Sequence, residues 1–133
     1  MRVLLDTHIL IWAITVPERL GPETQSMILD AANNVLFSAA SIWEIAIKAA
    51  LRRRDFGTRP DAVAEEARDI GFIELPVHSS VAATVADLPL IHRDPFDRLL
   101  VAQAIAEPAI LLTADARLSA YSELVHSHVR RSK

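Results

Sequence analysis

Short apolar runs that alternate with helical segments constrain the fold of this chain more than any other feature of its sequence. Because these runs are largely apolar on both faces, they predict strands of a parallel sheet that helices cover on both sides. We therefore expect an α/β fold, a three-layer α/β/α sandwich with a central, mainly parallel sheet of four to five strands. The expected strands are "RVLL" (2–5), "VLFS" (35–38), "FIEL" (72–75), "AILLT" (109–113) and "ELVHSHV" (123–129).

Residues that start or stop helices mark the ends of the segments between these strands. Pro22 suits the first turn of a helix, and Asp94 followed by Pro95 is typical of a helix N-terminus. Gly71 and Pro89 are residues at which helices end. The expected helices span 6–14, 22–32, 41–54, 58–70, 79–88, 94–106 and 115–121.

Length and composition indicate a globular chain. With 133 residues and no linker, repeat or low-complexity segment, we expect a single domain over 1–133 that ends in a flexible basic tail, "VRRSK". The absence of cysteine excludes thiol nucleophiles and zinc–thiolate sites. Asp6 and His8 interrupt the apolar N-terminus, which argues against a signal peptide, and no apolar run reaches the ~20 residues of a membrane span. We expect a cytoplasmic protein.

Acidic residues occur where the expected strands end. Asp6 directly follows the first strand, and one residue separates Asp115 from "AILLT". Glu44 lies about one turn into the helix after "VLFS", and Asp97 lies three residues after Asp94 at the start of another helix. Because crossover helices start near the carboxyl edge of a parallel sheet, we expect these acids to meet at one rim of the sheet.

Each of these acids also has an ordinary structural explanation. Asp6, Asp94 and Asp115 suit helix N-caps. Glu44 suits an ion pair one turn along its helix, and Asp97 suits a capping box. Carboxylates gathered in one place, however, raise each other's pKa unless a cation neutralises them, and hard oxygen ligands favour Mg²⁺ or Mn²⁺. The joint arrangement predicts metal-dependent phosphodiester hydrolysis.

Other functions of α/β proteins lack their motifs in this sequence. The three glycines, Gly21, Gly57 and Gly71, form no phosphate-binding loop, and no G-x-S-x-G elbow is present. A haloacid-dehalogenase-type phosphatase needs a second aspartate two residues after the first, where this chain has His8. A receiver domain needs an acidic pair near its first strand and a phosphorylated aspartate after its third, and "FIELPVH" offers neither.

Four phrases occur in order across nearly the whole chain: "VLLDTHILIWA", "SAASIWEIAIK", "DPFDRLLVAQA" and "LLTADARL". Together they resemble the PIN domain family, and within it the VapC-type ribonuclease toxins of type II toxin–antitoxin systems in bacteria. The resemblance implies a PIN-like fold and Mg²⁺- or Mn²⁺-dependent endoribonuclease activity. It also implies RNA as the substrate, a homodimer, a small VapB-like antitoxin as the inhibitor, and a larger toxin–antitoxin assembly.

The resemblance further implies roles for individual residues. Asp6, Glu44, Asp97 and Asp115 match the four catalytic, metal-binding acids of the family, and Thr113 matches a position that often carries a hydroxyl near the site. In the implied mechanism Asp6 and Asp97 bind the principal ion. Glu44 and Asp115 act through water, on a second ion or on the attacking water, and the products carry a 5′-phosphate and a 3′-hydroxyl.

Arginines near the acids are the candidates for RNA contact. Arg93 and Arg98 flank the acids of the "DPFDR" phrase, although Arg98 also suits pairing with an acid. Arg52 and Arg53 close a helix, where cations also complement the helix dipole. The net charge of −3 neither supports nor excludes a polyanionic substrate, since the position of the charges decides. A PIN-fold protein that binds RNA without cleaving it remains an alternative.

Overall fold

A computed structural model describes the chain over residues 1–51 and 58–127. Within them five strands form one sheet in the order β3-β2-β1-β4-β5, and every neighbouring pair is parallel. This confirms the predicted α/β fold with a parallel sheet. The strands are β1 (Arg2–Leu5), β2 (Asn34–Ser38), β3 (Ile73–Leu75), β4 (Ile110–Thr113) and β5 (Val125–Ser127).

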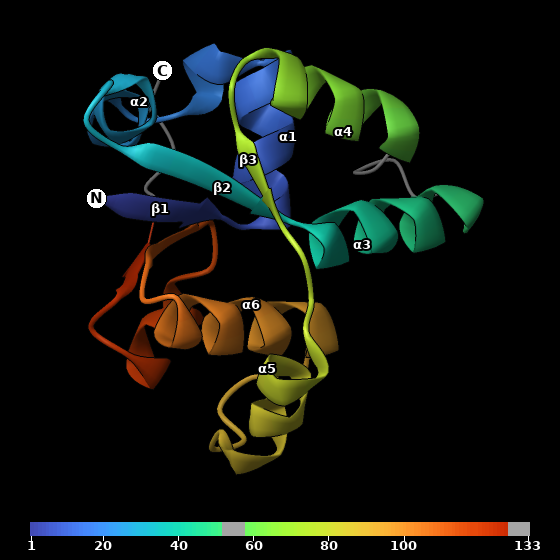
Figure 1. The fold of residues 1–133 in the computed structure, drawn as a ribbon, viewed down its shortest axis with the longest axis vertical. Coiled ribbons are helices and arrows are strands. Elements are labelled where there is room, and N and C mark those ends of the chain that lie inside the picture. Colours follow the sequence, from blue (N-terminus) through green and yellow to red (C-terminus); the bar gives the residue numbers. More distant parts are fainter. Residues whose placement is uncertain (52–57, 128–133) are drawn as a thin grey trace.

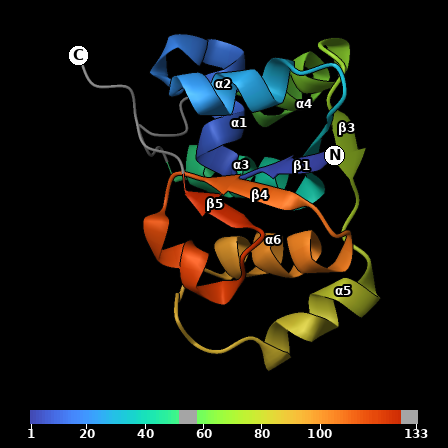
Figure 2. The same cartoon turned by 90° about the vertical axis from the view of Figure 1, so that its left-hand side faces the viewer.

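Helices cover both faces of this sheet and form the outer layers of the sandwich. Helices α1, α2 and α4 lie on one side of the strands, and α5 and α6 lie on the other (Figure 1). The same division is visible after a quarter turn, with β4 and β5 in front (Figure 2). The helices are α1 (Thr7–Thr15), α2 (Pro22–Leu29), α3 (Ala39–Ala50), α4 (Pro60–Asp69), α5 (Ser79–Thr84) and α6 (Pro95–Ala106), with 3₁₀ segments η1 (Pro17–Arg19), η3 (Val85–Asp87) and η4 (Ala116–Tyr121).

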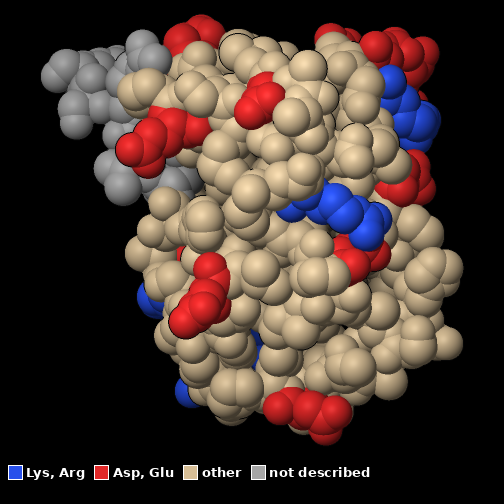
Figure 3. Space-filling model, turned by 60° about the vertical axis from the view of Figure 1, so that its left-hand side comes forward, with Lys and Arg blue, Asp and Glu red and all other residues tan. Residues whose placement is uncertain are grey.

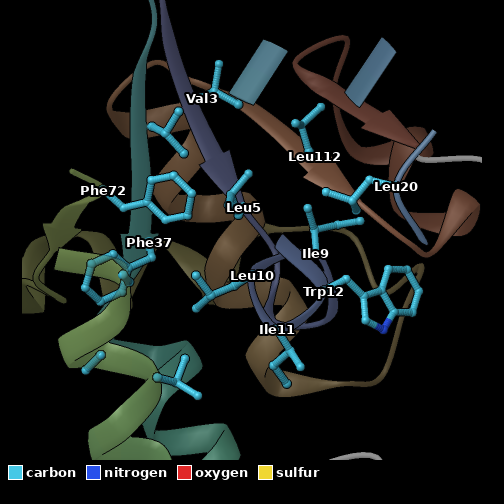
Figure 4. Close-up of a cluster of buried hydrophobic side chains, with 14 of the residues drawn as sticks. Val3, Leu5, Ile9, Leu10, Ile11, Trp12, Leu20, Phe37, Phe72 and Leu112 are labelled. Carbon is cyan, nitrogen blue, oxygen red and sulfur yellow. The ribbon is translucent and has the colours of Figure 1, made fainter. Parts of the chain in front are cut away.

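The buried strand residues divide between the two faces of the sheet, because successive side chains of a strand point in opposite directions. Val3 and Leu5 pack in the cluster that also contains α1 and α4 side chains, shown in Figure 4. Leu4, between them, packs with Leu100 of α6 in the second cluster. Both faces of β1 are thus apolar and covered, which explains why its sequence shows no alternation of polar and apolar residues.

Most of the predicted boundaries are close to the observed ones, and the differences have local causes. Helix α3 begins two residues before the expected start, because the Ser38 hydroxyl accepts the Ala40 N–H and caps it there. Gly71 ends α4 with a φ of 98°, as expected of a residue without Cβ. The expected helix over 79–88 tightens into 3₁₀ geometry after Thr84, and the segment after Asp115 is entirely 3₁₀.

The strand order places a crevice at the carboxyl edge of β1 and β4. The chain from β1 to β3 adds strands on one side of β1, whereas β4 and β5 lie on its other side. Ligands of open α/β sheets bind at such a reversal of strand order. No helix among the described residues is long and apolar enough to cross a membrane.

Candidate active site

Asp6 is held at the end of β1 by three hydrogen bonds. Its Oδ1 accepts from the backbone N–H of Ile9 at 2.8 Å, so Asp6 is the N-cap of α1. Its Oδ2 accepts from the Thr113 hydroxyl at 2.6 Å and from the Ala114 N–H at 2.9 Å. Burial raises the pKa of Asp6, and the hydrogen bonds oppose that shift. Thr113, which was expected near the site, therefore fixes the direction of the Asp6 carboxylate.

The start of α6 carries two acids with different environments. Asp94 Oδ1 accepts from the N–H groups of Phe96 at 2.8 Å and Asp97 at 3.2 Å, which confirms Asp94 as the N-cap that precedes Pro95. A capping box, the alternative considered for Asp97, does not form. The Asp94 N–H instead donates to Nδ1 of His92 at 3.0 Å. Helix initiation therefore makes no use of the Asp97 carboxylate.

Asp97 has no close hydrogen-bonded partner for its carboxylate among the residues that the structure describes. Its side chain is 20% exposed and accepts no hydrogen bond from them, and His92 Nε2 lies 3.9 Å from its Oδ2. Burial, followed by the negative charges of Asp94 and three other nearby acids, raises the pKa of Asp97 to about 8. A cation at this place would favour the ionised carboxylate.

Asp115, in contrast, is surrounded by donors. It is the N-cap of η4, where Oδ1 accepts the Arg117 N–H at 3.0 Å. The Arg117 guanidinium donates to both carboxylate oxygens, at 3.0 and 2.7 Å, and His92 Nε2 lies 2.8 Å from Oδ2. The hydrogen bond from Arg117, with a smaller contribution from His92, holds the pKa of Asp115 well below its usual range.

Glu44 is a buried residue of α3 and does not line the pocket at the sheet edge. Only 3% of it is exposed, and both of its carboxylate oxygens have partners within the protein. The Thr7 hydroxyl donates to Oε1 at 2.6 Å, and the Lys48 ammonium donates to Oε2 at 2.6 Å. The ion pair between Glu44 and Lys48 was the structural explanation expected from their spacing, and it forms.

A cavity of about 390 Å³ lies at the carboxyl edge of β1 and β4. Three of the four predicted acids line it, and Glu44 is not among the lining residues. The indole of Trp12 reaches this cavity from the margin of the buried cluster in Figure 4. The lining residues are Asp6, His8, Trp12, Asp97, Ala114, Asp115 and Ala116.

Two residues at the site escaped the sequence analysis, His92 and Arg117. The ligand atoms of His92, Asp97 and Asp115 all lie within 4.8 Å of one another. His92 is two residues before a helix cap, a position without a distinctive pattern, and only the fold brings it to Asp115. Asp115 and Arg117, by contrast, are only two residues apart, so an ion pair between them could have been predicted from the sequence.

The donor set fits a divalent cation with a preference for oxygen ligands. Asp6, Asp97 and Asp115 present carboxylates to one cavity, and no thiol is present in the chain. Burial and neighbouring acids disfavour the ionised form of Asp97, which is the condition that a bound cation would relieve. Carboxylate oxygens suit Mg²⁺ and Mn²⁺.

The arginines expected to contact RNA have different surroundings. Arg98 donates from Nη2 to the carbonyl oxygens of Val85 and Leu88, at 3.3 and 3.0 Å, so it caps the end of η3 and pairs with no acid there. Arg93 is exposed beside the α6 cap. Arg52 and Arg53, like the "VRRSK" tail, lie outside the described residues.

Comparisons with known proteins agree with this geometry. The PIN domain family matches residues 3–124. Ribonuclease VapC22 from Mycobacterium tuberculosis is 33% identical over 124 residues, which cover 90% of this chain and 91% of that protein.

Two solved structures share the fold at 16% sequence identity. VapBC2 from Rickettsia felis, bound to a DNA fragment from its promoter, aligns with a TM-score of 0.69 over 97% of this chain and 100% of that one. VapBC-1 from nontypeable Haemophilus influenzae aligns with a TM-score of 0.64 over 96% of both chains. The family match covers nearly the whole chain, and the shared fold agrees with the parallel sheet. The chain therefore belongs to the PIN domain family.

Proposed function

We propose that this protein is a metal-dependent endoribonuclease, the toxin component of a VapBC-type toxin–antitoxin system. One observation carries the proposal: three carboxylates from three elements line one cavity at the switch point of the sheet, and neighbouring acids raise the pKa of one of them, Asp97. The similarity to Ribonuclease VapC22 over 90% of the chain supports RNA as the substrate.

Asp6 and Asp97 are the proposed ligands of the principal metal ion, Mg²⁺ or Mn²⁺. A divalent ion supplies a water of lowered pKa and neutralises charge on the phosphodiester. The Thr113 hydroxyl and the Ala114 N–H both donate to Oδ2 of Asp6 and fix its carboxylate. Oδ1 accepts one hydrogen bond, from the Ile9 N–H, so this oxygen keeps a lone pair that could bind a cation. Asp97 contributes a carboxyl group whose pKa is raised to about 8, and a bound cation would favour its ionised form.

Glu44 and Asp115 are proposed to act at longer range. The Thr7 hydroxyl and the Lys48 ammonium donate hydrogen bonds to the Glu44 carboxylate. The negative charge of Glu44 also raises the pKa of Asp97, by less than burial and the charges of Asp94 and Asp6 do. Asp115 lines the cavity but its oxygens accept from Arg117 and lie near His92. Asp115 thus suits the orientation of waters around an ion better than direct ligation, whereas Glu44 would act on the site through its negative charge.

RNA binding is proposed to depend on local charge at the pocket. On the face drawn in Figure 3, acidic and basic side chains are scattered among uncharged ones, with no continuous basic surface among the coloured residues. Arg93 and Arg117 are exposed beside the acids and are the described arginines best placed for a phosphate. Arg98 is less suited, because its guanidinium is engaged by two backbone carbonyls.

A small VapB-like antitoxin and a second copy of this chain are the proposed partners. The two structural neighbours are VapBC complexes, and this supports an antitoxin as a partner. Coexpression with small proteins encoded next to this gene tests the first partner, since a silenced complex should co-purify. Light scattering of the purified chain tests the homodimer.

The experiment that tests the function is RNA cleavage by the purified protein with added Mn²⁺. We expect cleavage that EDTA abolishes and excess Mn²⁺ restores, with 5′-phosphate ends on the products. Binding of RNA without cleavage under these conditions would favour the non-cleaving alternative and contradict the proposal.

A further inference from the structure

We propose that His92 is a positioning residue of the active site, which orients Asp115 through its Nε2–H and sets the spacing between Asp115 and Asp97. The inference rests on the proposed function in assuming that these carboxylates surround a metal ion. It gives a role to a buried side chain that is no part of the four-acid set. The imidazole is only 9% exposed and lies between two elements that are distant in sequence.

The hydrogen bonds of the ring determine which nitrogen carries the proton. His92 Nδ1 faces the backbone N–H of Asp94 at 3.0 Å, and an N–H can only donate. Nδ1 must therefore be the unprotonated acceptor, and the ring proton is on Nε2. That Nε2 lies 2.8 Å from Oδ2 of Asp115, so the imidazole donates a hydrogen bond to this carboxylate.

The same geometry argues against His92 as a ligand of the metal. With Nδ1 accepting from the Asp94 N–H and the proton on Nε2, neither nitrogen has a lone pair available to an ion in the cavity. The Nε2–H is also 3.9 Å from Oδ2 of Asp97, too long for a hydrogen bond but close enough to separate the two carboxylates. His92 thus acts through Asp115.

His92 is itself anchored at the backbone to the segment that carries Asp115. The His92 N–H donates to the Tyr121 hydroxyl at 2.9 Å, and the Ile91 N–H lies 3.2 Å from the same oxygen. Tyr121 is the last residue of η4, the 3₁₀ segment that Asp115 caps. The loop before α6 and the segment after β4 are therefore joined at two places, Tyr121 and the imidazole.

Arg117 cannot replace this function, although it binds the same carboxylate. Its side chain is 72% exposed, so water and salt screen its interaction with Asp115 and its long stem keeps conformational freedom. The imidazole is buried, short and fixed at both nitrogens. Outer partners of metal-binding groups, when removed, typically cost about 10- to 100-fold in metal affinity.

Two substitutions separate the orienting role from a purely structural one. In His92→Gln the amide nitrogen lies near the position of Nε2, so the donor to Asp115 is kept and the acceptor for the Asp94 N–H is lost. In His92→Asn the amide oxygen lies near Nδ1, so the acceptor is kept in an Asx-turn arrangement and the donor to Asp115 is lost. The two variants thus each retain one of the two hydrogen bonds of the ring.

The measurement is Mn²⁺ affinity by calorimetric titration, with circular dichroism to verify folding. We expect His92→Gln to bind Mn²⁺ within about 3-fold of the unmodified protein and His92→Asn to bind about 10-fold more weakly, close to the effect of replacing Asp115 itself. Equal affinities in all three proteins, equal losses in both variants, or a greater loss in His92→Gln would each overturn the inference. Failure of the unmodified protein to bind Mn²⁺ would overturn the proposed function as well.

Two further readouts do not depend on the stability of the Asn variant. In an Asp115→Asn background, replacing His92 by Gln or Asn should cause no further change in Mn²⁺ affinity, because the residue acts through the Asp115 carboxylate. A further 10-fold loss there contradicts the inference. In the unmodified protein, imidazole ¹H–¹⁵N correlation spectra should show the Nε2–H tautomer of His92, and the Nδ1–H tautomer would contradict it.

Discussion

Asp97 and Asp115 line the same cavity, yet their surroundings are opposite. Asp97 accepts no hydrogen bond from the described residues, and burial and neighbouring acids raise its pKa to about 8. Asp115 has donors at both oxygens, from Arg117 and His92, and its pKa is held well below the usual range. The protein thus supplies a counter-charge for Asp115, whereas Asp97 is the carboxylate that we propose a cation neutralises. The difference predicts unequal consequences when either acid is replaced.

The largest effect is expected for Asp97→Asn. Cleavage of RNA should fall by at least about 100-fold, because removal of an outer partner alone already costs 10- to 100-fold. The matched control is Asp94→Asn, which removes the same charge three residues away while asparagine keeps the N-cap. We expect this control to retain cleavage within about 5-fold, as measured with a fluorescent RNA. Full activity of Asp97→Asn would contradict the proposed difference between Asp97 and Asp115.

The next effect concerns pH. Because the pKa of Asp97 is about 8, its proton must leave before a cation binds, and Mn²⁺ affinity should fall by about 10-fold per pH unit below 8. Calorimetric titrations at pH 6, 7 and 8 measure this slope. In Asp97→Asn, any remaining binding should lack it. A pH-independent affinity in the unmodified protein would contradict the raised pKa.

The same shift affects the stability of the metal-free protein, with a defined sign. The folded-state pKa of Asp97 lies above the unfolded value, so the protonated carboxyl stabilises the fold fully below about pH 4. That contribution is lost as the pH rises through about 8. In denaturant titrations at pH 9, Asp97→Asn should therefore have a free energy of unfolding roughly 1–3 kcal/mol above that of the unmodified protein. This difference should shrink at pH 5. A difference that grows toward acid pH has the wrong sign for this account.

Asp115→Asn should have a smaller effect on cleavage, about 10-fold. The carboxylate lines the cavity, but its charge is already compensated by Arg117 and by the His92 donor. The Asp115→Asn protein should have a lower free energy of unfolding than the unmodified protein, because the cap of η4 loses a charge-assisted hydrogen bond. This direction is opposite to the one expected for Asp97→Asn. A loss of cleavage as large as that of Asp97→Asn would show that the two acids are equivalent ligands.

The smallest effect is expected for Arg117→Gln. The ion pair is exposed on its arginine side, so stability should change by less than about 1 kcal/mol. Loss of the competing guanidinium should raise Mn²⁺ affinity by about 2- to 5-fold. If affinity fell instead, Arg117 would support the metal site and not compete with it.

The sequence predicted the sheet because the evidence for it is local. The buried runs at β1, β2 and β4 are apolar on both faces. The helix ends at Asp94 and Gly71 obey rules that involve only neighbouring residues. The position of Asp97 at the third residue of α6 follows from that cap alone. The rim that gathers Asp6, Asp97 and Asp115 then follows from the topology of parallel crossovers.

The contacts that distinguish the acids could not be predicted in this way. His92 reaches Asp115 across 23 residues, and Thr113 reaches Asp6 across 107, so both depend on how β1, β4 and α6 pack. Glu44, which was also expected among the metal-binding acids, is buried and bonded to Thr7 and Lys48, and only the Lys48 spacing was visible in the sequence. Periodicity identifies which face of a helix is buried, but it does not give the depth of one polar side chain.

A crystal structure of the protein grown with Mn²⁺ tests the central claim most directly. Anomalous difference density should show an ion bonded to carboxylate oxygens of Asp6 and Asp97, at about 2.0–2.4 Å, with Arg117 and His92 still beside Asp115. The same crystals of Asp97→Asn should lack that peak. Density that is absent from the cavity of the unmodified protein, or an ion bound to Asp115 without Asp97, would contradict the account.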